Sequence, residues 1–463
     1  MASPRPLLVD LAERVHAVRY EALPAAVIAH ARTLILDTLG CALGGLHGAP
    51  SEAVRAMARA LGGAPAATVW GTGDKTSVAL ATLANGTALR YLDGNDYVFA
   101  RDPAHPSAHL AVALAVGEPL RISGRRLIES LVAAYEIHLR LAEAAGAPAL
   151  WKRGWHHGTN AQFPAAGLAA SLMQSDPIVT AHAMAIAGSH HNTLAQLQSG
   201  EISMIKASAE AWVTKGGVEA AVLACHGMTG PLALIEGRHG WADSVAGAVD
   251  ADLLRMPLDG RFRLADVCIK PYPAVATAMA PIQAALDLSG EVRGDPAAVE
   301  RIEVRLPSYA LGTPSAAPDR RYPAGRESAD HSFFYCVAIA LLDGACGEAQ
   351  FDERNLQRPQ LRQLLAQVQL VEAPALNALW PGAAGGGVTV TLRDGRQLSQ
   401  DYAYPPGHPR QPLTAQQVAT KFHAHADPVL SPPRSARVRE MIDCIDECPD
   451  IGALCAALRP LAG

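Results

Sequence analysis

Two loop segments of this chain carry residue types that could do acid–base chemistry. The first is Leu92-Asp-Gly-Asn-Asp-Tyr97, followed by His105-Pro106-Ser107, which places two carboxylates, an amide and a histidine on a turn-rich stretch. Proline suits the first turn of a helix, so we expect His105 at a helix N-terminus, where the dipole lowers the pKa of an imidazole. Asp93 and its neighbours are also ordinary turn residues, so local backbone bonding explains the same cluster.

The second segment is Trp155-His156-His157-Gly158, just before a predicted helix. Paired histidines at a helix entry could bind a metal or move protons. One buried and one solvated imidazole would give the same sequence.

A third segment, Asp330-His331-Ser332, opens an apolar helix that runs to Leu342. Either Asp330 or Ser332 could cap this helix. His331 beside the cap and Tyr335 one turn further on could both reach a ligand.

Lysine is scarce, because only six of the 39 basic residues are Lys. Two of the six, Lys206 and Lys270, lie among apolar neighbours, so we expect both ammonium groups in one shared polar cavity. A compact ammonium suits a substrate carboxylate. The alternative is that each lysine extends along apolar surface and reaches solvent.

Composition excludes several classes of protein. With 463 residues, the chain should form two to four domains. Hydrophobic residues at 49% and charged residues at 18% exclude a disordered chain. The net charge of −5 argues against nucleic-acid binding, which needs a basic face.

The sequence also predicts the compartment. No uninterrupted apolar run is long enough to cross a membrane, and the apolar start at residues 7–9 is too short for a signal peptide. We therefore expect a cytoplasmic protein without a membrane partner, and eight free, mostly buried thiols.

Familiar cofactor motifs fail on inspection. In Gly71-Thr-Gly-Asp-Lys75, Asp74 stands where a phosphate loop needs glycine. Cys444 and Cys448, four residues apart, make half a metal site at best, and packing in the core is favoured. No cofactor is predicted.

Hydrophobic periodicity predicts a mainly α fold. Helices are expected at 23–45, 106–117, 123–145, 161–174, 178–190, 208–226, 414–424 and 436–459. The pattern changes near residue 270, where Val299–Leu306 alternates like a strand and residues 388–398 read as a hairpin around Asp394-Gly395. We predict a helical domain of residues 1–267 with 408–463, and a smaller α+β domain inserted at 268–407.

In these segments the sequence resembles the MmgE/PrpD family, which contains 2-methylcitrate dehydratases, cis-aconitate decarboxylases and an iminodisuccinate epimerase. The matching pieces, in the family's order, are LDGNDY…HPS at 92–107, WHHGTN at 155–160, SMIKASAEAWVTKGG within 203–231, IKPYP at 269–273 and ADHSFFYCVAIALLDG at 329–344. The resemblance implies a homodimer whose α+β domain acts as a lid, with the site between lid and helical body.

The resemblance also implies which residues line that site. The positions that match are Asp93, His105, His156, Lys206, Lys270 and Tyr335. We assign His105, His156 and Tyr335 to catalysis, and Asp93, Tyr97, Lys206, Lys270 and His331 to substrate binding. Tyr97 departs from the family, which often has threonine there, and a phenol is expected to narrow the pocket.

Such a site would act on a small polycarboxylic acid. Dehydration, decarboxylation and epimerisation each place negative charge on a carbon next to a carboxylate, and the remedy is an acid or base with fixed positive charge. The expected function is a metal-free lyase of the 2-methylcitrate dehydratase or cis-aconitate decarboxylase kind. The alternatives are an epimerase of a dicarboxylate such as iminodisuccinate, a non-catalytic acid-binding homologue, or a metal-dependent hydrolase using His105, His156 and Asp93.

Overall fold

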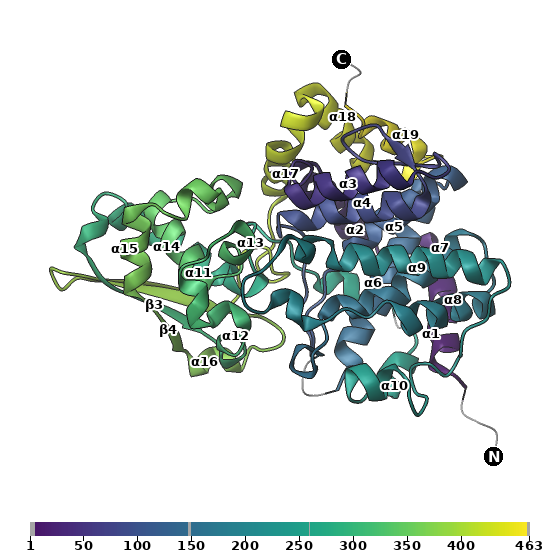
Figure 1. The fold of residues 1–463 in the computed structure, drawn as a ribbon, viewed down its shortest axis with the longest axis horizontal. Coiled ribbons are helices and arrows are strands. Elements are labelled where there is room, and N and C mark those ends of the chain that lie inside the picture. Colours follow the sequence, from purple (N-terminus) through teal and green to yellow (C-terminus); the bar gives the residue numbers. More distant parts are fainter. Residues whose placement is uncertain (1–4, 147–149, 259, 461–463) are drawn as a thin grey trace.

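The chain builds two hydrophobic cores, which appear as two lobes in Figure 1. The computed structural model describes residues 5–146, 150–258 and 260–460. The larger core belongs to what we call the helical region, residues 5–267 and 408–460, and the smaller to the α+β region, residues 268–407. The outermost residues of the predicted helical domain, 1–4 and 461–463, lie outside the described ranges.

The helical region is built almost entirely from helices, as the periodicity predicted. Its helices are α1 (Leu7–Ala17), α2 (Ala25–Gly44), α3 (Ala49–Leu61), α4 (Val78–Tyr91), α5 (Ala108–Leu120), α6 (Gly124–Ala144), α7 (Gln162–Leu172), α8 (Pro177–His190), α9 (Ala209–Cys225), α10 (Ala251–Arg255), α17 (Ala415–Leu430), α18 (Pro432–Asp443) and α19 (Gly452–Ala457). A hairpin of two short strands, β1 (Ala67–Thr68) and β2 (Lys75–Thr76), joins α3 to α4. The sequence did not predict this hairpin.

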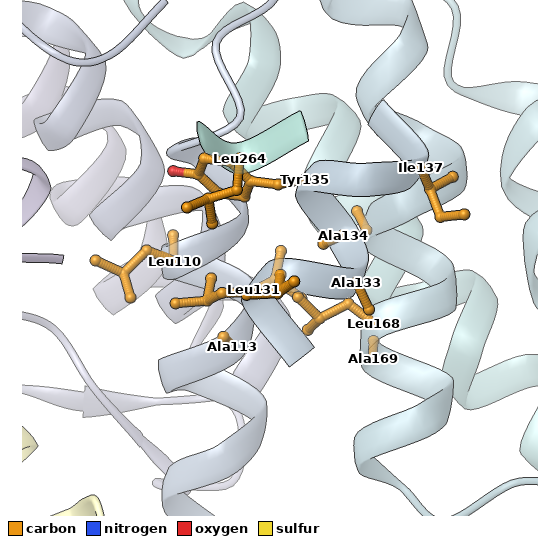
Figure 2. Close-up of a cluster of buried hydrophobic side chains, with 14 of the residues drawn as sticks. Leu110, Ala113, Leu131, Ala133, Ala134, Tyr135, Ile137, Leu168, Ala169 and Leu264 are labelled. Carbon is orange, nitrogen blue, oxygen red and sulfur yellow. The ribbon is translucent and has the colours of Figure 1, made fainter. Parts of the chain in front are cut away.

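The packing of α5, α6 and α7 explains why so few aromatic residues suffice. Small side chains such as Ala113, Ala133 and Ala169 let the helices approach closely, and leucines such as Leu131 and Leu168 fill the space between them (Figure 2). Alanine also loses no side-chain entropy on entering a helix. The result is a rigid helical body behind the loops that carry the polar segments.

Helix α2 is the one described helix that is long and apolar enough to cross a membrane by length and composition. In this structure two thirds of its apolar window is buried, and α2 packs against α4 and α17. Its Asp37 is buried and bound by Lys421 of α17 at 2.6 Å. The helix is therefore used as a core element here.

The chain's C-terminal part returns to the helical region, where α17 packs on α2 and α19 on α5. One prediction here is wrong: the helix expected at 436–459 starts earlier, at Pro432, and breaks at Cys444. Because the helix breaks there, Cys444 is exposed and does not pack in the core as expected, whereas Cys448 is half-buried against the core. All eight cysteines are free, and five of them are buried.

The α+β region is a four-stranded sheet with helices. Its strands are β3 (Val299–Leu306), β4 (Val368–Glu372), β5 (Gly386–Leu392) and β6 (Gln397–Tyr402), in the order β4-β3-β5-β6. Its helices are α11 (Met279–Val292), α12 (Ser308–Leu311), α13 (Arg326–Ala329), α14 (Phe333–Asp343), α15 (Pro359–Gln367) and α16 (Pro374–Asn377). The predicted strand and hairpin are both present, whereas β4, parallel to β3, was missed.

The two chain crossings between the regions lie side by side. The backbone N–H of Ile269 donates to the carbonyl of Gly407 at 3.0 Å, and the backbones of Cys268 and Tyr97 exchange two hydrogen bonds. Gly407 has φ +86°, and a Cβ there would lie 1.8 Å from the Ile269 carbonyl, so only glycine fits. This junction holds Lys270 against the loop that carries Asp93.

Candidate active site

A cavity of about 590 Å³ lies between the helical region and the α+β region. The helical region supplies Arg90, Asp93, Phe99, Asp102, Pro103, His105, Trp151, Lys152, His157, Ala195, Gln198, Ser199, Ile202 and Lys206. Residues 268–407 supply Lys270, Val275, Ala276, Thr277, Tyr309, Thr313, Pro314, Ser315, Arg320 and His331. Five of the eight residues predicted for the site, Asp93, His105, Lys206, Lys270 and His331, therefore line one cavity.

Asp93 is the centre of the charged part of the cavity. It follows the end of α4 and has φ +51°, a left-handed conformation that Asp tolerates better than most residues. The Lys206 ammonium donates to Oδ1 at 2.9 Å, and the Lys270 ammonium donates to Oδ2 at 2.7 Å and to the Asp93 carbonyl at 2.8 Å. Burial opposes ionisation of Asp93, but these ammonium groups hold its pKa well below the ordinary value.

The two lysines share this cavity, as predicted from their apolar neighbours, and do not reach out to solvent. Lys206 is 7% exposed and Lys270 is fully buried. Burial lowers the pKa of Lys270 to about 8, against the attraction of Asp93. Each ammonium has three donors, and Asp93 takes one from Lys206, which leaves donors for a ligand.

Two residues that the sequence reasoning did not single out, Arg90 and Glu210, extend this cluster. Arg90 of α4 lies 2.9 Å from Glu210 of α9 through Nε, 3.5 Å from Asp93 through Nη2, and donates to the side chain of Asn95. Burial opposes ionisation of Glu210, but Arg90 keeps its pKa well below the ordinary value. The buried charges then sum to three cations against two carboxylates, a surplus of one positive charge facing the cavity.

The α+β region adds a fourth cation, Arg320, which no pattern in the sequence singled out. Its Nη2 donates to the Gln198 carbonyl at 2.9 Å, while its Nη1 is buried and has no hydrogen-bond partner within the described chain. A buried guanidinium donor with no partner is costly unless something binds it. We call Arg90, Asp93, Lys206, Lys270, Arg320 and His331 the cationic end of the cavity.

His105 lies at this end with one ring nitrogen fixed. Its Nδ1 lies 2.7 Å from the Asp96 carbonyl, which only accepts, so Nδ1 carries the hydrogen and Nε2 of the neutral ring keeps its lone pair. Burial, and then Arg90, lowers the pKa of His105 well below 6.5. The predicted direction is confirmed, but burial, not the dipole of α5, is the main cause.

Asp96 holds the loop that carries His105. Its Oδ1 accepts from the Ser107 backbone at 3.1 Å and its Oδ2 from the Tyr135 hydroxyl at 2.8 Å. Burial raises the pKa of Asp96 to about 6. Asn95 adds a bond to Ser107 at 2.8 Å, so this part of the acidic cluster does the local bonding that the alternative interpretation described.

Of the neighbouring pair His156 and His157, His157 lines the cavity and His156 does not. The Nδ1 of His156 accepts from the Gly158 backbone at 3.0 Å, and its Nε2 lies 2.9 Å from the Gln198 side-chain amide. The ring of His157 lies 4.0 Å from that of His156 and 5.3 Å from that of His105, and its Nε2 is 3.5 Å from Glu210. His156 therefore caps the turn before α7, and His157 supplies the ring that lines the cavity.

His331 lies where the sequence predicted a ligand contact. Its Nδ1 is hydrogen-bonded to Asp330, and its Nε2 is 3.8 Å from Asp93. Burial, and then Lys206, lowers the pKa of His331 despite the neighbouring Asp330. Ser332 is the residue that caps α14, accepting from the Tyr335 backbone at 3.0 Å.

Tyr335 and Tyr97 both lie outside the cavity. Tyr335 is in the first turn of α14, with its ring beside Phe351 and its hydroxyl donating to the Gln350 carbonyl at 2.7 Å. Tyr97 belongs to the core of the α+β region, and its backbone pairs with that of Cys268. The structure therefore does not bring these two residues together with the other predicted site residues, and Tyr97 is not among the residues that line the pocket.

Some of the missed residues carried a signal in the sequence. Arg90 is three residues before Asp93, which is helical spacing for an ion pair, and Glu210 follows Lys206 by four residues in an apolar helix. A carboxylate in such a helix needs a buried partner. Arg320 and the aromatic lining residues carried no such signal. Within the described residues, no three or more His, Cys, Asp or Glu side chains are grouped so as to hold a metal ion.

Comparison with known proteins places this chain in a family. Residues 9–254 match the MmgE/PrpD N-terminal domain and residues 272–447 the MmgE/PrpD C-terminal domain. The cis-aconitate decarboxylase of Mus musculus is 26% identical, with 97% of this chain and 93% of that protein covered. The 2-methylcitrate dehydratase of Cupriavidus necator is 27% identical, with 88% and 87% covered. The cis-aconitate decarboxylase of Aspergillus terreus is 22% identical, with 94% and 92% covered.

Proposed function

The chain belongs to the MmgE/PrpD family, and from this premise we propose that it is a lyase acting on a small polycarboxylic acid. The observation that carries the proposal is the cationic end of the cavity, with its surplus of positive charge and a buried guanidinium donor of Arg320 that has no partner. Both a dehydratase and a decarboxylase of such acids are among the relatives.

The proposed chemistry uses the side chains at this end. One substrate carboxylate binds Lys206 and Lys270, whose positions Asp93 fixes, and a second binds the unpartnered Nη1 of Arg320. Cleavage of a C–H or C–C bond next to a carboxylate leaves an electron pair on carbon, which spreads onto the carboxylate oxygens. Fixed ammonium and guanidinium groups stabilise that charge without reorganising.

His105 is the proposed proton carrier. As a neutral ring with a free Nε2 lone pair it can remove a proton from carbon in a dehydration, and it can return one to carbon after a decarboxylation. In the dehydration the hydroxyl leaves as water, taking the proton that His105 removed from carbon. His157 beside Glu210 is the second candidate for proton transfer in place of His156.

We propose that the reaction proceeds with these side chains alone. Both Asp93 oxygens are already engaged by ammonium groups, so this carboxylate is not free to bind a cation. The metal-dependent hydrolase that used Asp93, His105 and His156 is thereby disfavoured on geometry. Activity that survives exhaustive chelation would support the proposal, whereas loss that stoichiometric zinc or iron restores would overturn it.

Residues 268–407 are proposed to act as an inserted lid over the helical body. The paired crossings at Ile269 and Gly407 would let the region move as a unit about one junction. Its residues Arg320 and His331 contribute to the cationic end, so closure would complete the site around a bound acid.

A homodimer is proposed, with α9 at its interface. This helix and the segment before it expose a series of large apolar side chains, Met204, Ile205, Trp212, Val222 and Leu223. Exposed apolar surface of this kind is typical of an interaction site. Light scattering should give twice the chain mass, and Trp212→Glu with Leu223→Glu should give the monomer; a monomeric wild-type chain would overturn the proposal.

A cytoplasmic location is proposed because all eight thiols are free, as in a reducing compartment. Fractionation of the source cells with an antibody to the chain would test this. Recovery outside the cytoplasmic fraction would contradict it.

The decisive experiment is a substrate screen with product analysis. Purified protein is incubated with citrate, 2-methylcitrate, cis-aconitate and iminodisuccinate, and the products are separated and identified. Loss of water or of carbon dioxide supports the proposal and chooses between its two forms. Inversion of iminodisuccinate alone would make the chain an epimerase, and tight binding of several acids without turnover would make it a binding protein.

A further inference from the structure

The cavity has a second end that the proposed chemistry does not use. Phe99, Trp151 and Tyr309 line it, and we call these three residues the aromatic end. Behind them Trp380 stacks on Tyr309 with ring centroids 3.7 Å apart and lies 5.0 Å from Phe99. The three lining rings come from separate segments in both regions, and Trp380 fixes two of them in place.

Phe99 and Asp102 lie on a small hairpin that also positions the cationic end. The backbones of Val98 and Ala104 exchange two hydrogen bonds of 3.0 Å, which sets Phe99 and Asp102 at the tip and His105 at the base. The tip is joined to the next segment because Asp102 Oδ1 accepts from the Leu150 backbone at 2.9 Å. The hairpin therefore connects the two ends of the cavity.

The polar groups at the aromatic end do not favour a second carboxylate there. Asp102 is fully buried and its Oδ2 has no hydrogen-bond partner in the described ranges, so an anion beside it would meet a carboxyl group. Lys152, the cation that lines this end, is exposed and lies over the Trp151 ring at 5.4 Å. Among the other lining residues of the α+β region, Val275, Ala276 and Pro314 are apolar, and Thr277, Thr313 and Ser315 carry a hydroxyl group but no charge.

The size of the cavity fits the same conclusion. A volume of about 590 Å³ lies in the range of roughly 300–1,000 Å³ that holds drug-sized ligands. An unsubstituted six-carbon tricarboxylic acid would occupy the cationic end and leave the aromatic end empty of ligand. Apolar pockets of that kind gain affinity from apolar ligand surface.

We propose that the substrate is a polycarboxylic acid that carries an apolar arm longer than a methyl group, and that the arm lies between Phe99, Trp151 and Tyr309. This inference rests on the proposed function and names the substrate class for the same site. The carboxylates bind the cationic end, and contact with the aromatic end determines which arm lengths bind well. Trp380 acts through Tyr309 and Phe99 as a positioning residue.

Binding of inert analogues tests the arm independently of which reaction the enzyme performs. Calorimetry measures the affinity of the full-length protein for propane-1,2,3-tricarboxylate carrying a 2-alkyl chain of one, three or six carbons. Each buried methylene should tighten binding about fourfold, the equivalent of about 0.8 kcal/mol. Affinity that stays flat or falls from one carbon to six would overturn the inference.

Variants locate the effect at the aromatic end. Tyr309→Ala and, separately, Phe99→Ala should each lower affinity for the six-carbon analogue at least about fivefold while leaving that for the one-carbon analogue within twofold. Tyr322→Ala, which removes an exposed ring of the α+β region, is the matched control and should change neither. Retained binding of the one-carbon analogue shows that the variants fold, and an unchanged length dependence in both would overturn the assignment.

Turnover distinguishes failure of this inference from failure of the proposed function. The enzyme is assayed with the 2-alkylcitrates and 2-alkyl-cis-aconitates of the same chain lengths. Rising kcat/KM with chain length supports both claims, and turnover that favours the methyl compounds overturns only the arm. Absence of turnover for every acid tested overturns the lyase, and the calorimetric series then decides the arm by itself.

Discussion

The two ends of the cavity are built on opposite principles. At the cationic end almost every charge has a partner inside the protein, since Lys206 and Lys270 share Asp93 and Arg90 is bound to Glu210. At the aromatic end Tyr309 and Phe99 pack on Trp380, and Oδ2 of the neighbouring Asp102 has no hydrogen-bond partner within the described residues. The first end is organised before a ligand arrives, as electrostatic catalysis requires, and the second is shaped mainly by contact surface.

The largest effect should come from removing the proposed proton carrier at the cationic end. His105→Ala should lower kcat about 10²–10⁴-fold, because a positioned general acid or base contributes that much. His157→Ala should act in the same direction, and His156→Ala less, since His156 does not line the cavity. The exposed His239→Ala is the matched control. Near-normal kcat in His105→Ala on the true substrate would remove His105 from the mechanism.

The next largest effect should come from removing a lysine at the cationic end. Lys206→Met should lose about 10–150-fold in kcat/KM, because hydrogen bonds to charged groups contribute about 1.5–3 kcal/mol. Lys206→Arg should also fail at least partly, since a planar fork does not replace a compact ammonium beside Asp93. Lys215→Met, which removes a half-buried lysine of α9, is the control. Free tolerance of Lys206→Arg would mean that the ammonium is incidental.

Lys270 is expected to behave differently from Lys206. Lys270 is fully buried and makes two bonds to Asp93, so its loss should lower stability as well as activity. Removing one partner of such a pair costs about 3–5 kcal/mol of stability. Denaturant unfolding should therefore show Lys270→Met less stable than wild type, and a variant of unchanged stability would contradict the buried pairing.

The aromatic end predicts a pH effect on stability. Burial raises the pKa of Asp102 to about 7, so the folded chain binds this proton more tightly than the unfolded chain does. The associated stability is present below about pH 4 and is lost as the pH rises to about 7. Asp102→Asn should match wild type near pH 4 and exceed its free energy of unfolding by about 1–3 kcal/mol at pH 8. A constant difference across this range would show that Asp102 titrates normally.

The smallest effect should be a change in mobility where the two regions join. If residues 268–407 close on the ligand, a bound tricarboxylate should slow hydrogen exchange at 268–275, because Lys270 and the prolines at 271 and 273 sit at the crossing. The sheet at β5 and β6 should exchange at the same rate with and without ligand. Unchanged exchange at 268–275 would argue for a site that is already closed.

The sequence by itself determined the elements and much of the chemistry. Helical periodicity predicted most of the long helices, and the alternation at Val299–Leu306 predicted strand β3. Local patterns suffice here because they decide which face of an element is buried. The scarcity of lysine singled out Lys206 and Lys270, and the family motifs indicated Asp93, His105 and His331. All five residues line one cavity.

Only the tertiary structure decided which neighbour of a motif faces the ligand. His156 caps a turn and does not line the cavity, whereas its neighbour His157 does. The position of Tyr335 on α14 directs its side chain into the core of the α+β region. The orientation of each side chain depends on the conformation of one turn of backbone, which the spacing of residues in the sequence does not determine. Arg320 and the aromatic end come from segments far apart in the chain, so their meeting follows from the packing of the two regions and from no local pattern.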